Sequence, residues 1–134
     1  MTKKILITVG FLGMVAILLF VLERVVFFSP LINYFNFDTA ISLHFFHTIV
    51  LLTFAFKNKY IRETKINILY TAFVAGIVLA CTPLYLMHYI DPVGSTKGIL
   101  TIISFVGSGS LIGGWVMVTY IGFSYNSKFR EKKD

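Results

Sequence analysis

The stretch INILYTAFVAGIVLACTPLYLMHY, residues 66–89, runs for 24 positions without a Lys, Arg, Asp or Glu. A helix rises about 1.5 Å per residue, so roughly 20 residues cross a hydrocarbon core about 30 Å thick. Backbone N–H and C=O groups find no water in that core, and a single isolated segment satisfies them only as a helix. A barrel strand would be about half as long and would alternate polar with apolar residues. The stretch therefore predicts a transmembrane α-helix.

Three more uncharged apolar runs divide the rest of the chain, at residues 5–22, 39–56 and 99–125. The 134 residues are 57% hydrophobic and 13% charged, with a mean hydropathy of +0.82, whereas soluble domains are roughly half apolar. We therefore predict an all-α membrane protein with one domain, residues 1–134, and four transmembrane helices in an antiparallel bundle. The helices are expected at approximately residues 5–28, 39–56, 66–89 and 99–125.

The charges indicate how the chain is oriented in the membrane. Of the 12 Lys and Arg residues, Arg24 and Lys97 fall on one expected side of the membrane. The others fall on the opposite side: Lys3, Lys4, Lys57, Lys59, Arg62, Lys65, Lys128, Arg130, Lys132 and Lys133. The positive-inside rule then predicts that both termini are cytoplasmic. The net charge of +6 is explained by topology and an anionic leaflet, so no nucleic-acid partner is expected.

The first apolar run follows Lys3 and Lys4, as in a secretory signal, but it ends at Glu23 without a small-residue cleavage pattern. A retained helix explains it better. Residues 23–38 then form an expected surface loop, in which Tyr34, Phe35 and Phe37 would lie at the membrane interface.

Small residues predict a close contact between the last two helices. They are Ala72, Gly76 and Ala80 on the third helix, and Gly109 with Gly113 and Ser110 with Gly114 on the fourth. Small residues four positions apart let helix backbones approach closely inside a membrane. An alternative is that the Gly/Ser-rich segment 107–114 breaks the fourth helix and exposes carbonyl groups to a ligand.

Two histidines lie within the second apolar run. At 100° per residue, His44 and His47 share a face with Thr48 and Leu51, so both should point into the bundle. Glu23, at the end of the first helix, has a similar expected depth to His44. We therefore hypothesise an outer-side polar cluster of Glu23, His44 and His47, with a hydrogen bond between Glu23 and His44.

Other chemistry is less well supported by the residues present. Haem ligation would need a second inward histidine at equal depth, and His88, the only candidate, is expected nearer the helix end and on another face. A single cysteine, Cys81, and two histidines three positions apart are a weak metal signal. A proton relay would need an acid within the last three helices, and none is present there. We expect no enzymatic site, cofactor or metal, and we expect the indole of Trp115 to need a partner inside the bundle.

Three motifs carry a family resemblance. Phe46-His47-Thr48 in the second helix, Leu84-Tyr85 in the third and the segment from Gly107 to Trp115 in the fourth resemble the YgdD-type family, domain of unknown function 423. The resemblance implies a small four-helix protein of the bacterial inner membrane.

This chain departs from the family pattern at several places. His44 stands where the family has a glutamine, and Glu23, or Arg24 with a shift of one residue, stands where it has a histidine. Thr82-Pro83 and the segment 104–108 also differ from the family's Gly-Ser and Thr-Pro-x-Gly-Gly strings. The resemblance therefore implies fold and location more than mechanism.

So small a bundle has no extramembrane domain and no charged pathway. We therefore expect a non-catalytic accessory or interaction subunit, embedded in the lipid bilayer beside a membrane-protein partner or a second copy. The alternative is a small transporter or a haem-type cofactor carrier that uses the polar cluster of Glu23, His44 and His47.

Overall fold

The computed structural model describes residues 2–25, 34–57, 61–90 and 92–130. Within them the chain forms four α-helices: α1 (Thr2–Val25), α2 (Tyr34–Lys57), α3 (Glu63–Ile90) and α4 (Gly94–Arg130). Each contains a segment long and apolar enough to cross a membrane. The described part of the chain is thus all-helical, as the uncharged runs predict.

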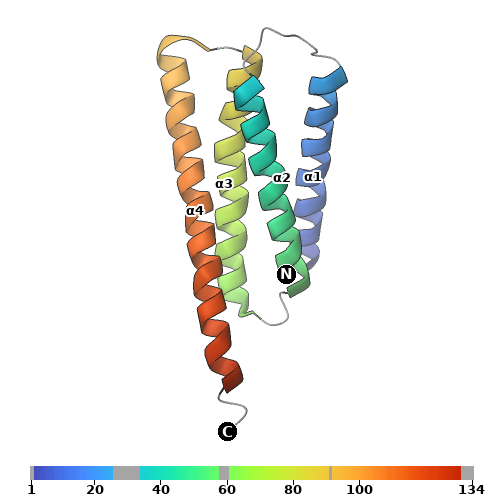
Figure 1. Ribbon diagram of the computed structural model, residues 1–134, viewed down its shortest axis with the longest axis vertical. Coiled ribbons are helices and arrows are strands. Elements are labelled where there is room, and N and C mark those ends of the chain that lie inside the picture. Colours follow the sequence, from blue (N-terminus) through green and yellow to red (C-terminus); the bar gives the residue numbers. More distant parts are fainter. Residues whose placement is uncertain (1, 26–33, 58–60, 91, 131–134) are drawn as a thin grey trace.

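The helices alternate in direction (Figure 1). α1 and α3 run upward in that view and α2 and α4 run downward, so the first residues of α1 and the last of α4 lie at the same lower end. We call the two ends of the bundle upper and lower as in Figure 1. The first helix, expected over 5–28, is observed over Thr2–Val25, and residues 26–28 lie outside the described residues.

The helices pack in chain order as an open row. α1 packs on α2, α2 on α3 and α3 on α4, whereas the other helix pairs make little backbone contact. The outer helices α1 and α4 are consequently the more exposed, and α2 and α3 contribute most of the buried side chains. α4, at 37 residues, extends below the other helices (Figure 1).

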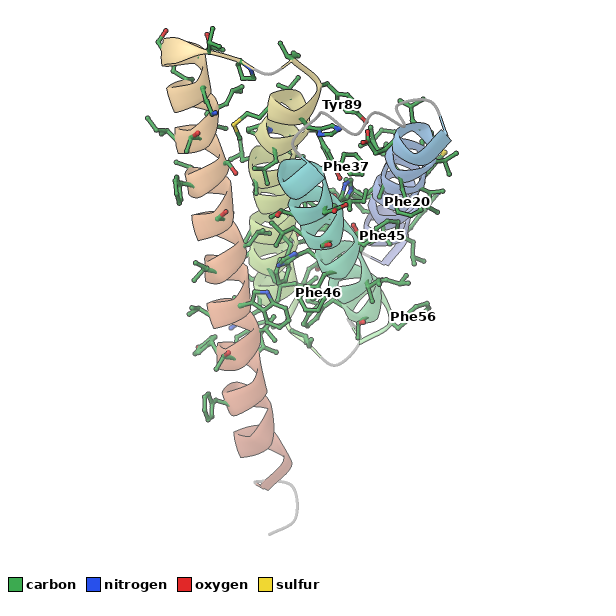
Figure 2. All side chains as sticks on the ribbon, turned by 45° about the horizontal axis from the view of Figure 1, so that its top comes forward. Phe20, Phe37, Phe45, Phe46, Phe56 and Tyr89 are labelled. Carbon is green, nitrogen blue, oxygen red and sulfur yellow. The ribbon has the colours of Figure 1, made fainter. Side chains whose placement is uncertain are left out.

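A small apolar cluster lies at the upper end of the bundle, where Ala16, Phe37 and Ile41 pack together. We expected Phe37 to lie in a surface loop, and this was wrong; its expected place at the membrane interface stays a prediction. α2 begins at Tyr34, so Phe37 falls in its first turn and is only 1% exposed. Figure 2 shows Phe37 at the upper end of α2, near Tyr89 of α3, and the two ring centroids are 6.4 Å apart.

The α3–α4 contact is the closest in the bundle. A Cβ built on Gly107 would overlap the Ala80 backbone nitrogen, so only glycine permits this approach of the two backbones. Gly76 faces the Leu111 side chain and Gly114 faces the Phe73 ring. We call this contact the seam.

Two serine hydroxyls join the backbones across the seam. Ser110 Oγ donates to the Ala72 carbonyl at 2.9 Å, and Ser104 Oγ donates to the Ala80 carbonyl at 3.1 Å. Hydrogen bonds of this kind add to dispersion where lipid supplies no hydrophobic drive between helices. α4 remains helical through residues 107–114, so the expected alternative of a broken helix does not occur.

The small residues expected at this contact divide into two groups. Ala72, Gly76, Ala80 and Gly114 lie in the seam. Gly109 and Gly113 do not: a Cβ on either would meet nothing within 4 Å. At 100° per residue they project about opposite to Gly107 and Leu111, which corrects the expectation that they pack on α3.

Candidate functional site

His47 joins α2 to α4 through Trp115. The indole Nε1–H of Trp115 donates to His47 Nε2 at 3.2 Å, and His47 Nδ1 lies 2.8 Å from the Leu43 carbonyl. Because Nε2 accepts, the proton of a neutral ring must sit on Nδ1, where it is donated to that carbonyl. Both ring nitrogens are therefore satisfied, and the expected need of Trp115 for an internal partner is met.

Aromatic rings pack against this pair. Phe46 stacks on Trp115 with centroids 5.8 Å apart, and Phe73 lies 5.5 Å from the His47 ring. Offset and edge contacts of this kind stabilise aromatic clusters beyond the area they bury. Phe46 is placed lower on α2 than Phe37 in Figure 2. His47 is thus built into a packed contact between helices.

His44, one turn above His47, has a different environment. Its Nδ1 lies 3.3 Å from the Tyr85 hydroxyl of α3. The Leu12 backbone of α1 is close to the ring, yet Nε2 makes no hydrogen bond of standard geometry within the described residues. His44 is only 4% exposed, so this nitrogen is shielded from lipid and water without a good partner.

The His44 ring borders a cavity of about 250 Å³ between α1, α2 and α3. Ten residues line it: Phe11, Leu12, Val15, Leu19, His44, Ile77, Val78, Cys81, Thr82 and Tyr85. The cavity exists because α2 packs on both α1 and α3, while those two helices make little backbone contact with each other. We call it the α1–α3 cavity.

Glu23 is buried against His88. Its Oε2 lies 3.0 Å from His88 Nε2, and the two side chains are 3% and 0% exposed. The rings of Phe37 and Tyr89 cover His88, with centroids 5.2 Å and 4.9 Å from its own. A shared proton between these two atoms satisfies a carboxyl and an imidazole that would each be costly to bury alone.

The hydrogen bond expected between Glu23 and His44 is therefore not the one formed, since Glu23 pairs with His88. His88 lies in the last turn of α3, near the helix end as expected, but the sequence analysis did not identify it as the partner of Glu23. Its signal was the topology: α1 and α3 run in the same direction, so residues near their last turns meet at the upper end (Figure 1).

The lower ends of α1 and α3 are also joined by polar side chains. The hydroxyls of Thr8 and Tyr70 are 2.7 Å apart, and Lys4 Nζ lies 5.2 Å from the centre of the Tyr70 ring. These contacts and the Glu23–His88 pair tie α1 to α3 at both ends of the α1–α3 cavity.

The expected cluster of Glu23, His44 and His47 is thus divided among three partners, namely His88, Tyr85 and Trp115. Among the described residues, no three His, Cys, Asp or Glu side chains come close enough together to hold a metal ion. The described residues thus offer hydrogen bonding between helices and a partly open, mostly apolar cavity.

Comparison with known proteins places the chain in a family. A family model described as a protein of unknown function (DUF423) matches residues 31–114, which is more than half of the chain, so the chain belongs to this family. The match covers α2, α3 and the upper half of α4, including His44, His47, His88 and the seam glycines. No curated protein matches the chain, and no solved structure matches it.

Proposed function

For this member of a family of unknown function, we propose a role as a non-catalytic interaction subunit, which binds another membrane-spanning polypeptide through the free face of α4. One observation carries the proposal: Gly109 and Gly113 are four residues apart in a transmembrane helix and face open space. The seam supports this use of glycine, because Gly107 and Gly114 of the same helix let α3 approach closely. A second helix would find a similar surface on the free face.

The rest of the free face suits a helix partner. Ile102, Val116 and Tyr120 share the direction of the two glycines and are 64%, 65% and 55% exposed. Large apolar residues above and below a small-residue step give a partner helix both a groove and flanking contacts. The free face of α4 is apolar around Gly109 and Gly113, so lipid tails would cover it when no partner is bound.

Charge favours a different polypeptide over a second copy as the partner. A parallel symmetric dimer through α4 would bring together two C-terminal segments, residues 128–134, each with four Lys or Arg and two Asp or Glu and so a net charge of +2. Two segments of the same net charge repel each other. A partner with acidic residues at the same membrane surface would instead be attracted.

The proposed setting is the inner membrane of a bacterium, with both termini in the cytoplasm. The uneven distribution of Lys and Arg supports it. A Lys128→Cys variant on a Cys81→Ala background should resist a membrane-impermeant maleimide in intact cells. Labelling from outside would overturn the orientation.

The interaction is tested by photo-cross-linking in native membranes, with a benzophenone amino acid in place of Val116. We expect a product that contains a second, different polypeptide and that disappears when Gly113 is replaced by Ile. The matched controls lie on α1: a benzophenone at Ile17, which is 55% exposed, and a Gly13→Ile variant, at another glycine facing open space.

The proposal fails if Val116 gives no product, or if Ile17 gives the same product. A product made of two copies of the 15.2 kDa chain would replace the proposed partner with self-association. Survival of the product in Gly113→Ile would remove the glycine face from the contact.

The haem-carrier alternative has less support. His44, His47 and His88 are each directed to a different partner. A cavity of about 250 Å³ also falls below the 300–1,000 Å³ that usually hold drug-sized ligands. A Soret absorption band in protein purified in mild detergent would revive that alternative.

A further inference from the structure

We propose that the gap between α1 and α3 binds one anionic phospholipid from the membrane leaflet at the lower end of the bundle, with its phosphate at Lys4 and one acyl chain running up to the α1–α3 cavity (Figure 1). The inference is independent of the proposed partner surface on α4, because α4 lies at the other end of the row of helices. It rests on a continuous groove, on its depth in the membrane and on the charge at its lower end.

A strip of residues on α1 connects Lys4 with the cavity. Thr8 and Phe11 follow Lys4 at spacings of four and three residues, and Val15 and Leu19 of the cavity wall continue at spacings of four, so all five share one face of the helix. Lys4 and Phe11 are exposed, and the other three are half-buried. A molecule that lies along α1 from Lys4 therefore reaches the cavity by a path that is open to lipid.

α3 forms the opposite wall of the same groove. Tyr70, Val74 and Val78 follow one another at spacings of four residues, and Val78 belongs to the cavity wall. Tyr70 lies at the depth of Lys4, since Lys4 Nζ is 5.2 Å from the centre of its ring. The hydroxyl contact between Thr8 and Tyr70 crosses the gap at this level, and both residues keep part of their surface exposed. They form a floor over which a chain can pass.

The dimensions suit an acyl chain of one leaflet. Such a chain extends through half of the hydrocarbon core, or about 15 Å. Val15 lies about 16 Å above Lys4 along the helix, so a chain whose phosphate is at Lys4 ends in the lower part of the cavity. The hydroxyls of Thr82 and Tyr85 belong to residues about 18 Å and 22 Å above Tyr70. The chain would therefore contact the apolar part of the cavity wall and stop below these hydroxyls.

Lys4 supplies a contact for the phosphate. Its side chain is exposed, and in the described part of the chain no acidic side chain forms an ion pair with it. The Tyr70 ring holds the ammonium group at the lower mouth of the groove. An ammonium group that lies over a ring keeps N–H donors for a phosphate oxygen.

The surrounding charge favours a lipid with a net negative headgroup. The described side chains at the lower ends of α1 and α3 include four cations and one anion, a net charge of +3: Lys3, Lys4, Arg62 and Lys65, with Glu63. Glu63 shares the face of Tyr70 but lies about 10 Å lower, outside the position of the phosphate. Clustered basic residues at a membrane surface attract anionic lipids. Phosphatidylglycerol should therefore bind better than phosphatidylcholine, whose quaternary ammonium cancels the phosphate charge.

Native mass spectrometry of the full-length protein, released from a neutral detergent, tests the proposal by counting the lipids that each chain retains. Dioleoyl phosphatidylglycerol is titrated, and dioleoyl phosphatidylcholine, with the same acyl chains, is the comparison. We expect one retained phosphatidylglycerol per chain, with an affinity at least about fivefold above that of phosphatidylcholine. No retained phosphatidylglycerol, or equal affinity for the two lipids, overturns the proposal.

A matched pair of lysine variants tests the phosphate contact. Lys4→Gln should weaken phosphatidylglycerol binding about fivefold. Lys3→Gln removes the same charge from the neighbouring position, which projects about 100° away from Lys4, and should weaken binding less than about twofold. Equal losses in the two variants would mean that the lipid responds to overall charge, and would remove Lys4 as its site.

A second pair of variants tests the acyl chain without changing the charge. Val78→Trp narrows the groove at a position that is 48% exposed, so it requires no repacking, and it should weaken binding about fivefold. The control is Val116→Trp on α4, which is 65% exposed and should bind like the wild type. Wild-type affinity in Val78→Trp would overturn the placement of the chain.

Glycerol 3-phosphate, which has a phosphate but no acyl chain, distinguishes a lipid site from a site for free phosphate. It should not displace the retained phosphatidylglycerol, because the groove contributes most of the contact. Displacement at a concentration comparable to that of the lipid would show that the phosphate alone is recognised, and would overturn the lipid as the ligand.

Discussion

The seam between α3 and α4 and the gap between α1 and α3 are two solutions to the same problem of packing helices in lipid. In the seam, glycine and alanine bring backbones into contact, and serine hydroxyls bond across to carbonyls. In the gap, large side chains face one another, and polar groups join the helices at both ends. The first arrangement leaves no space and the second leaves a cavity.

The difference shows that the position of small residues on a helix matters more than their number. α1 contains Gly10 and Gly13, but a Cβ on either would meet nothing within 4 Å, so both lie away from α3. The α1 residues toward the cavity include Leu12, Val15 and Leu19, which hold the backbones apart. A close α1–α3 contact is therefore sterically blocked.

The largest expected effect is from breaking the seam with Gly107→Ala. The added methyl would meet the Ala80 backbone, which cannot move aside as a side chain can. We expect a loss of about 3 kcal/mol in the free energy of unfolding, at the upper end for overpacking. Unfolding in mixed micelles measures it, and Gly109→Ala is the control, expected within about 0.5 kcal/mol of the wild type.

Breaking the Glu23–His88 pair should have the next largest effect on the free energy of unfolding. Glu23→Ala removes the carboxyl group that bonds His88 Nε2 in a buried site, and we expect a loss of about 2 kcal/mol in the free energy of unfolding. A double-mutant cycle with His88→Ala should give a coupling energy above about 1 kcal/mol, and one with His44→Ala should give less than about 0.5 kcal/mol. The reverse pattern would restore the Glu23–His44 bond that the sequence suggested.

A smaller effect is expected at the contact between α2 and α4. Trp115→Phe keeps an aromatic ring but removes the donor to His47 Nε2, at a cost of about 1 kcal/mol. In a His47→Phe background the same change should cost markedly less, because the acceptor is already absent. Equal costs in the two backgrounds would mean that the hydrogen bond does not contribute.

The smallest effect should come from enlarging a residue in the gap. Val15→Leu adds one methylene toward the α1–α3 cavity, where there is space, and should change stability by less than about 0.5 kcal/mol. Ala80→Val adds two carbon atoms in the seam and should cost about 1–3 kcal/mol. Similar costs at the two positions would mean that the gap closes in the membrane.

Much of this fold follows from the sequence because uncharged runs of sufficient length must be helical in lipid. The small residues of α3 also indicated the side on which α4 packs. The sequence does not show which face of α4 packs on α3, because residues 107–114 carry glycine on two sides of the helix. The observed packing shows that Gly107 and Gly114 are the glycines that meet α3.

The hydrogen-bond partners of the polar side chains were harder to predict from the sequence. His44, His47 and Trp115 were recognised as inward-facing groups, but their partners depend on helix rotation and depth to within one turn. Glu23 and His88 are 65 positions apart, and no local pattern connects them. Their pairing follows from the parallel directions of α1 and α3, together with an order of packing that the sequence does not specify.

Trp115 is the chain's only tryptophan, and its indole bonds to a histidine on another helix. The protein therefore carries one intrinsic fluorophore, whose emission reports the contacts of α4 with α2 and α3. A partner that displaces α4, or a variant that loosens it, should shift that emission without any added label, so the association of this small protein can be followed optically in an intact membrane.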